Sequence, residues 1–222
     1  MTGEIGSGKS TVIRSLVKRL TSDNVEVGVL THPSLSLIEL LREIHYQLGI
    51  PSPPEDKLGL IRGLNDRLMA NYRGGKDTVI IIDEAHLIRD PEILEELRLL
   101  LNFQLNDRFL LTLILAGQPE LKKTIHDIPS LEQRITIRYH LGGFDLEESK
   151  RYIAFRLKRS GGKTSIFTME AVNLIYQHSK GIPRDINRLC DLALLFGYLA
   201  RRHRVDSSLV TRVITDGDRF KG

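Results

Sequence analysis

The apolar positions of this chain follow two repeats, one typical of buried strands and one typical of amphipathic helices. Short apolar or alternating runs predict strands over residues 25–30, 78–83, 109–117 and 135–141. Spacings of three and four predict helices over residues 8–21, 34–50, 58–75 and 90–104. In the first helix the predicted apolar stripe is Val12, Leu16, Val17 and Leu20. Strands that alternate with helices predict a parallel sheet with helices on both faces.

After Gly142 and Gly143 the pattern is helical only, which predicts helices over residues 145–162, 168–181, 183–203 and 206–215. We therefore predict an α/β domain over residues 1–142 and an all-helical domain over residues 143–222. With 222 residues and 41% hydrophobic content, the chain can bury one core and a smaller second one. No run of 18 apolar residues is present, so we expect no transmembrane segment.

The net charge of +4 is unevenly distributed. Residues 151–222 hold 14 Lys and Arg against 6 Asp and Glu, a charge of +8, which leaves −4 for residues 1–150. This asymmetry favours an anion between the halves or nucleic acid on the surface, although solvated helix faces account for most such charges. Cys190 is the single cysteine, which fits a reducing compartment and a small core residue.

The segment "GEIGSGKS" at residues 3–10 matches the phosphate-loop pattern G-x-x-x-x-G-K-[ST]. Glycines let backbone N–H groups converge on phosphate oxygens, and the helix that follows adds its positive N-terminal end. We expect Lys9 to reach the β- and γ-phosphates and Ser10 to bind Mg²⁺. The candidate nucleotide ligands are Gly3, Glu4, Ile5, Gly6, Ser7, Gly8, Lys9, Ser10 and Thr11.

A second motif, which is acidic, follows the apolar run "VIII". Asp83 and Glu84 come at the C-terminal end of a predicted central strand, the edge where open α/β sheets bind ligands. We expect Asp83 to hold Mg²⁺ and Glu84 to polarise the water that attacks the γ-phosphate. The "DEAH" spelling at residues 83–86 also resembles a helicase motif, but helicases need two sheet domains. We therefore expect His86 to start a helix rather than to act in catalysis.

Arginines in two segments could offset the remaining phosphate charge, as arginine fingers do in phosphoryl transfer. Arg134 precedes the predicted strand over residues 135–141, and Arg138 lies on the strand face shared by Thr136 and His140. Arg184 opens the predicted helix after Pro183, with Arg188 one turn later and away from the apolar stripe. The alternative for each is a surface salt bridge.

Together these motifs resemble AAA+ ATPases with a RecA-like P-loop core and a helical lid. The segments "GEIGSGKST", "IIIDEAHLI", "LILAGQPEL", "LEQRITIRYHL" and "GIPRDINRLCDLAL" are similar to secretion ATPases of the general secretion pathway protein A type, a group that includes exosortase-linked ATPases. The resemblance implies ATP and ADP as ligands, Mg²⁺ as cofactor, and homo-oligomers with active sites at subunit junctions. It gives Gln118 the sensor 1 role, Arg134 or Arg138 the role of a finger offered to a neighbour, and Arg184 the sensor 2 role.

The resemblance further implies a cytoplasmic protein at the periphery of the inner membrane that drives assembly or export at the cell envelope. It places a central strand directly before the loop, but only Met1 and Thr2 precede it here, so the first strand is expected to be missing and the natural protein to begin upstream. The alternative function is an ATP-dependent DNA-binding regulator of the transposition-helper type, which the basic "ARRHRVD" segment at residues 200–206 favours. A third is a nucleotide-gated scaffold without turnover.

Overall fold

The computed structural model describes residues 1–21, 24–105 and 108–219, and it divides the chain into two compact units. The first unit contains residues 1–3 and 9–141, and the second contains residues 4–8 together with the chain from Gly142 onward. The loop segment Glu4–Gly8 therefore groups with the helical unit, although it lies near the N-terminus. The assignment of residues 1–142 as a nucleotide-binding core and 143–222 as a lid stays a prediction.

A parallel sheet forms the centre of the first unit, with strands β2 (Val25–Leu30), β3 (Asp77–Ile82) and β6 (Thr112–Leu115) in the order β2-β3-β6. Leu30 pairs with Ile82, and Ile82 with Leu115, so the C-terminal ends of the three strands are level. Five of the six residues of β3 are buried, as the continuous apolar run predicts. The segments that follow β3 and β6 consequently begin at the same edge.

The place next to β6 is taken by a strand of two residues, β1 (Thr2–Gly3), which pairs in parallel with β7 (His140–Leu141). Gly117, just after β6, donates its N–H to the Met1 carbonyl and accepts from the Gly3 N–H. The first strand is thus present in the structure with two residues, between β6 and β7.

The predicted strands over residues 135–141 and 109–117 are too long. Only His140–Leu141 and Thr112–Leu115 join parallel pairs, while Arg108–Phe109 (β5) pairs antiparallel with Gln104–Leu105 (β4). A strand needs a neighbour for its backbone groups, and β1 offers its neighbours only two residues. The alternating pattern alone could not show this, because the partner is distant in sequence.

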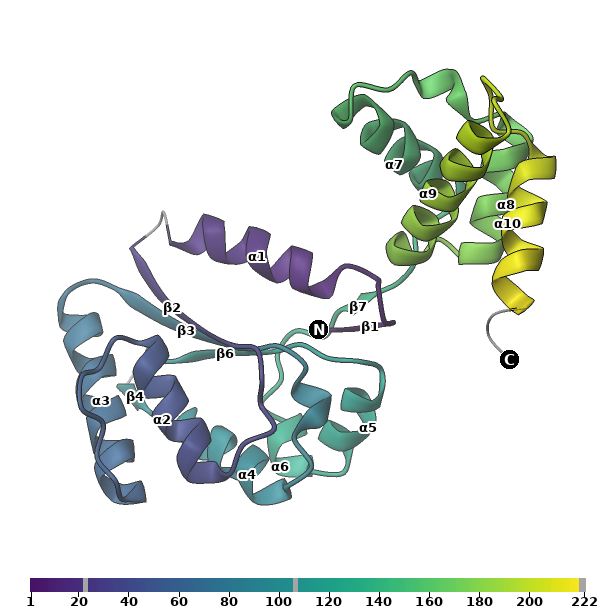
Figure 1. Cartoon of the computed structure of the whole chain (residues 1–222). Helices are drawn as coiled ribbons and strands as arrows, with labels where there is room; N and C mark the ends of the chain where they lie inside the picture. Colours follow the sequence, from purple (N-terminus) through teal and green to yellow (C-terminus); the bar gives the residue numbers. More distant parts are fainter. Residues whose placement is uncertain (22–23, 106–107, 220–222) are drawn as a thin grey trace. The chain divides into compact units, whose positions relative to one another are not determined.

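Helices cover both faces of this sheet (Figure 1). The helices of the first unit and its 3₁₀ turn are α1 (Lys9–Leu20), α2 (Leu37–Gln47), α3 (Lys57–Arg73), η1 (Ala85–Leu87), α4 (Pro91–Leu100), α5 (Glu120–His126) and α6 (Pro129–Glu132). Alternate residues of β3 divide between two cores: Ile80 and Ile82 pack with α2, α3 and α4, whereas Val79 and Ile81 pack with Ile13 of α1. The predicted stripe of α1 is wrong at Val12, which is 43% exposed, because the helix buries Ile13 instead.

The second unit is helical, with α7 (Leu146–Arg159), η2 (Thr164–Ile166), α8 (Met169–Ser179), α9 (Pro183–Leu199) and α10 (Ser207–Arg219). Its core includes Ile153, Ile175, Ile186 and Val210, one from each α-helix. Burial raises the pKa of the Cys190 thiol to about 12, which makes this cysteine a poor nucleophile and fits the predicted core role. Over the ranges that the structure describes, no helix combines the length and apolar character needed to cross a membrane.

Candidate active site

The phosphate loop enters from β1 and ends at the first residue of α1. Gly6 and Gly8 have φ values of +84° and +104°, which only glycine adopts without strain, so the local sequence is required for this turn. Lys9 is 6% exposed and its Nζ donates to the Gly3 carbonyl oxygen at 2.8 Å. The lysine ammonium therefore lies against the loop backbone, where phosphate oxygens are expected.

Ser10 and Asp83 are neighbours in space although 73 residues separate them in sequence. The Ser10 hydroxyl donates to Asp83 Oδ2 at 2.8 Å, and the Glu84 N–H donates to Asp83 Oδ1 at 2.9 Å. Asp83 is 6% exposed. A buried carboxylate beside a hydroxyl at the end of a central strand is a suitable pair of oxygen ligands for Mg²⁺.

The donor set fits a metal that arrives with its nucleotide. Within the described ranges, no three His, Cys, Asp or Glu side chains lie close enough to hold a metal ion by themselves. Mg²⁺ usually keeps several waters and takes one or two protein ligands plus substrate phosphates, which is what Ser10 and Asp83 can provide. Ser7 adds a buried hydroxyl that finds no hydrogen-bond partner among the described residues, as expected for a group that a phosphate oxygen would satisfy.

Glu84 follows in a strained backbone conformation, with φ 54° and ψ 32°. Its side chain is 39% exposed, and its Oε2 lies 3.4 Å from Nδ1 of His86. That same Nδ1 is 3.3 Å from the backbone nitrogen of Gln118, which follows Gly117 at the end of β6. The structure thus brings the predicted base and the predicted sensor 1 residue to a shared neighbour, His86, which the sequence reasoning placed only as a helix start.

Arg134 and Arg138 are both exposed in the first unit. Arg134 donates to Asn102 Oδ1 at 2.8 Å, and Arg138 forms an ion pair with Glu132 at 3.0 Å. The face predicted for Arg138 was wrong, because residues 135–139 form no strand and so share no strand face. Both guanidiniums lie on the surface, and Arg138 takes part in a surface ion pair.

Arg184 lies beside the phosphate loop, within the second unit. It is the second residue of α9, and its N–H donates to the Gly6 carbonyl at 3.3 Å. A Cβ on Gly6 would come within 2.6 Å of the Arg184 Cβ, so glycine is needed here for space as well as for φ. Arg188 is exposed one turn later, 3.7 Å from Asp185. Glu4, Ile5 and Thr11, also predicted as nucleotide ligands, are exposed.

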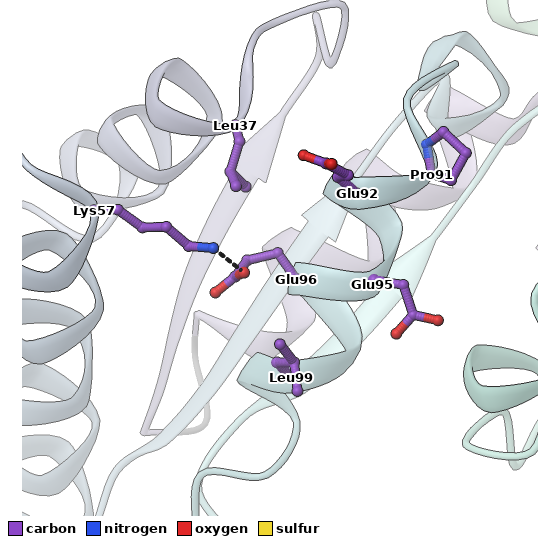
Figure 2. A pocket seen from close by; sticks show the side chains of 7 residues that line it. All are labelled: Leu37, Lys57, Pro91, Glu92, Glu95, Glu96 and Leu99. Atoms are coloured by element: carbon purple, nitrogen blue, oxygen red, sulfur yellow. Dashed lines mark ion pairs between the residues drawn. The ribbon is translucent and has the colours of Figure 1, made fainter.

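A separate hollow of about 330 Å³ lies among α2, α3 and α4 (Figure 2). Glu92, Glu95 and Glu96 contribute carboxylates to its lining, and Lys57 pairs with Glu96 at 2.6 Å. Three carboxylates against one ammonium disfavour a triphosphate. None of the predicted site residues lines this hollow, so it is not the nucleotide site.

Comparisons with known proteins agree with this geometry. A family model described as AAA domain matches residues 1–125. The chain is 38% identical over 209 residues to General secretion pathway protein A of Aeromonas hydrophila, covering 92% of this chain and 38% of that protein. It is also 39% identical over 99 residues to the ATP-dependent target DNA activator B of Escherichia phage Mu, covering 44% of this chain and 29% of that protein.

Among solved structures, the ORC2 protein of Aeropyrum pernix is similar with a TM-score of 0.66 at 20% identity, over 97% of this chain and 61% of that one. At this identity the likeness shows the fold alone. The chain spans less than half the length of both curated relatives. Since the family model covers more than half of this chain, and since the fold and the loop agree with it, the chain belongs to the AAA domain family and is an ATPase of that family.

Proposed function

We propose that this ATPase binds Mg²⁺–ATP at the loop over residues 3–10 and uses its hydrolysis to drive assembly or export at the bacterial cell envelope. The observation that carries the nucleotide part is the 2.8 Å hydrogen bond between Ser10 and Asp83. It joins the loop to the acidic strand end, the pairing that a metal-bearing triphosphate requires. The envelope role rests on the similarity to General secretion pathway protein A.

Four residues of the loop and the strand end have tasks in this proposal. Lys9 exchanges its bond to the Gly3 carbonyl for phosphate oxygens, and Ser10 and Asp83 hold the metal ion. Mg²⁺, when bound, neutralises part of the charge on the phosphates. Glu84 orients and deprotonates the attacking water, a task suited to a carboxylate that is partly exposed one residue after the metal ligand.

Gln118 and Arg184 report on the nucleotide in this proposal. Gln118 follows β6 at the same sheet edge, where its side chain would sense the γ-phosphate. Arg184 starts a helix that touches Gly6, so a phosphate in the loop would attract both its guanidinium and the helix N-terminus. The nucleotide state would in this way be transmitted to the helical unit.

A phosphate-release assay tests the nucleotide part. We expect Mg²⁺-dependent release from the wild-type chain, loss of ATP binding in Lys9→Ala, and a rate about 10²–10⁴-fold lower in Glu84→Gln with binding kept. Lys122→Ala, which removes an exposed lysine of α5, is the matched control and should leave both quantities unchanged. Equal rates for the wild-type chain and Glu84→Gln would remove Glu84 as the base.

Subunit mixing tests the proposed homo-oligomer and its arginine finger. Arg134 and Arg138 are on the surface of the first unit, and the ion pair of Arg138 with Glu132 is exposed enough to yield readily to a phosphate. We expect Arg138→Ala and Glu84→Gln each to be slow alone and to recover activity when mixed, because a mixed junction can pair an intact base with an intact finger. Mixing Glu84→Gln with Arg134→Ala instead shows which arginine acts. If activity recovers in neither mixture, a finger in trans is contradicted.

A second candidate function is ATP-dependent DNA binding. Arg201, Arg202 and Arg204 are exposed in the turn between α9 and α10, and the phage Mu relative is named as a target DNA activator. Binding through such a patch would weaken steeply as salt rises, because phosphate contacts release counterions. We expect Arg201→Ala with Arg204→Ala to lower the salt slope by about 2. The absence of DNA binding at low salt would eliminate this function.

A further inference from the structure

Among the polar residues of the "DEAH" segment, His86 alone has no task in the proposed mechanism. It lies in η1, directly after the strand end, and its side chain is only 10% exposed. Its Nδ1 faces two groups of the site at nearly equal distances, the Gln118 backbone nitrogen at 3.3 Å and the Glu84 Oε2 at 3.4 Å. A single ring nitrogen therefore stands between the predicted base and the predicted sensor.

Only one of these two contacts can be a hydrogen bond at any one time. The Gln118 N–H needs a lone pair on Nδ1, whereas the Glu84 carboxylate needs a hydrogen on that nitrogen. When Nδ1 accepts from Gln118, the neighbouring carboxylate receives nothing from the ring. This agrees with Glu84 Oε2, which is buried and accepts no hydrogen bond within the described part of the chain.

Backbone contacts bring both partners close to the ring. The Ala85 N–H donates to the Ala116 carbonyl at 2.8 Å, which ties η1 to the end of β6. Gly117 permits the close approach, since a Cβ there would lie 3.1 Å from the His86 backbone nitrogen and 3.2 Å from Nδ1. The left-handed conformation of Glu84 turns the chain between Asp83 and η1. Backbone contacts of η1 and of the segment after β6 therefore bring the ring close to both Glu84 and Gln118.

We propose that His86 is a positioning residue that couples the place of Gln118 to the availability of Glu84. While the Gln118 N–H occupies the Nδ1 lone pair, the ring holds Gln118 at the site and leaves the Glu84 carboxylate free to orient water. When Gln118 withdraws, the tautomer with hydrogen on Nδ1 binds Oε2 and holds the carboxylate. Hydrolysis then depends on the position of the residue that senses the nucleotide, an inference that rests on the proposed function.

Three variants at position 86 separate positioning from simple packing. Asn places a polar atom where Nδ1 lies, Gln places one only where Nε2 lies, and Leu keeps volume without polarity. We expect His86→Leu and His86→Gln to lower kcat by about 10-fold or more, because neither side chain offers the Gln118 N–H an acceptor in the place of Nδ1, so Gln118 is no longer held at the site. ATP affinity and melting temperature should stay near the wild-type values, and His86→Asn should restore most of kcat.

The results distinguish the inference from the proposed function. If the wild-type chain hydrolyses ATP but His86→Gln and His86→Leu keep a wild-type kcat, or His86→Asn is as slow as His86→Leu, the coupling is refuted while the ATPase site stands. A parallel fall of ATP affinity and melting temperature in all three variants would show a packing role and equally refute it. Absence of Mg²⁺-dependent hydrolysis in the wild-type chain would refute the proposed function, and the inference with it.

Discussion

The contact between Gly6 and Arg184 makes Gly6→Ala the most informative single substitution in the loop. The new Cβ would lie 2.6 Å from the Arg184 Cβ and 3.3 Å from Ile182 Cγ2, whereas carbon atoms pack at about 3.5–4.0 Å. Residue 6 also has a φ of +84°, where alanine loses about 1–2 kcal/mol. Overpacking of the neighbouring carbon atoms adds about 1–3 kcal/mol, for a total of about 2–5 kcal/mol.

The loop can relieve this strain only by leaving its present geometry, which ATP binding must then restore. At the low end of about 2 kcal/mol, the expected loss of ATP affinity is about 30-fold. Gly49→Ala is the matched control, because Gly49 has a φ of +61° with no atom near its missing Cβ. It should lower stability by about 1–2 kcal/mol and leave ATP affinity unchanged.

Calorimetric titration with ATP and thermal unfolding of both variants provide the assay. We expect Gly6→Ala to bind weakly at a temperature where it remains folded, and Gly49→Ala to bind normally. An ATP affinity of Gly6→Ala within about twofold of the wild-type value would refute the reasoning. It would mean that α9 does not begin against the loop.

Two further predictions concern stability. Gly63→Ala should lower the free energy of unfolding by about 1–3 kcal/mol despite better helix propensity, because its Cβ would lie 3.0 Å from Nε2 of the fully buried His45. Chemical denaturation measures this loss. The control is Asp66→Ala, which changes an exposed residue of the same helix and should not destabilise the protein. Burial raises the pKa of Glu26, but hydrogen bonds, first among them those from Arg67, hold it below its ordinary value of 4.5 overall. The stability that Glu26 contributes is therefore present above pH 4.5 and is lost as pH falls through the lower folded pKa. The urea midpoint should then fall less steeply with decreasing pH in Glu26→Gln than in the wild-type chain. Equal slopes for the two proteins would contradict this.

Elements with strong local signals could be predicted from the sequence. The strand over residues 25–30 and the buried run of β3 match the structure, and α4 has Asp90 as its N-cap, as predicted. The C-terminus of α2 near Gly49 follows from a residue that readily adopts positive φ. In each case a few adjacent residues determine the outcome.

Elements that depend on distant partners could not be predicted in the same way. Residues 135–139 alternate like a strand, but their pairing depends on β1, which is distant in the chain and supplies two residues. The short helices α5 and α6 offer too few turns for a periodic signal. At the site, the motifs gave Ser10 and Asp83 as candidates, whereas the place of His86 between Glu84 and Gln118 emerges only when β3 and β6 lie side by side.

The central claim is that Ser10 and Asp83 together hold the metal of a bound nucleotide. The most direct measurement is the gain in ATP affinity on adding Mg²⁺, by calorimetry, for the wild-type chain, Ser10→Ala and Asp83→Asn. We predict a clear gain for the wild-type chain and loss of most of it in either variant, with binding of metal-free ATP kept. The same gain in all three proteins would contradict the account.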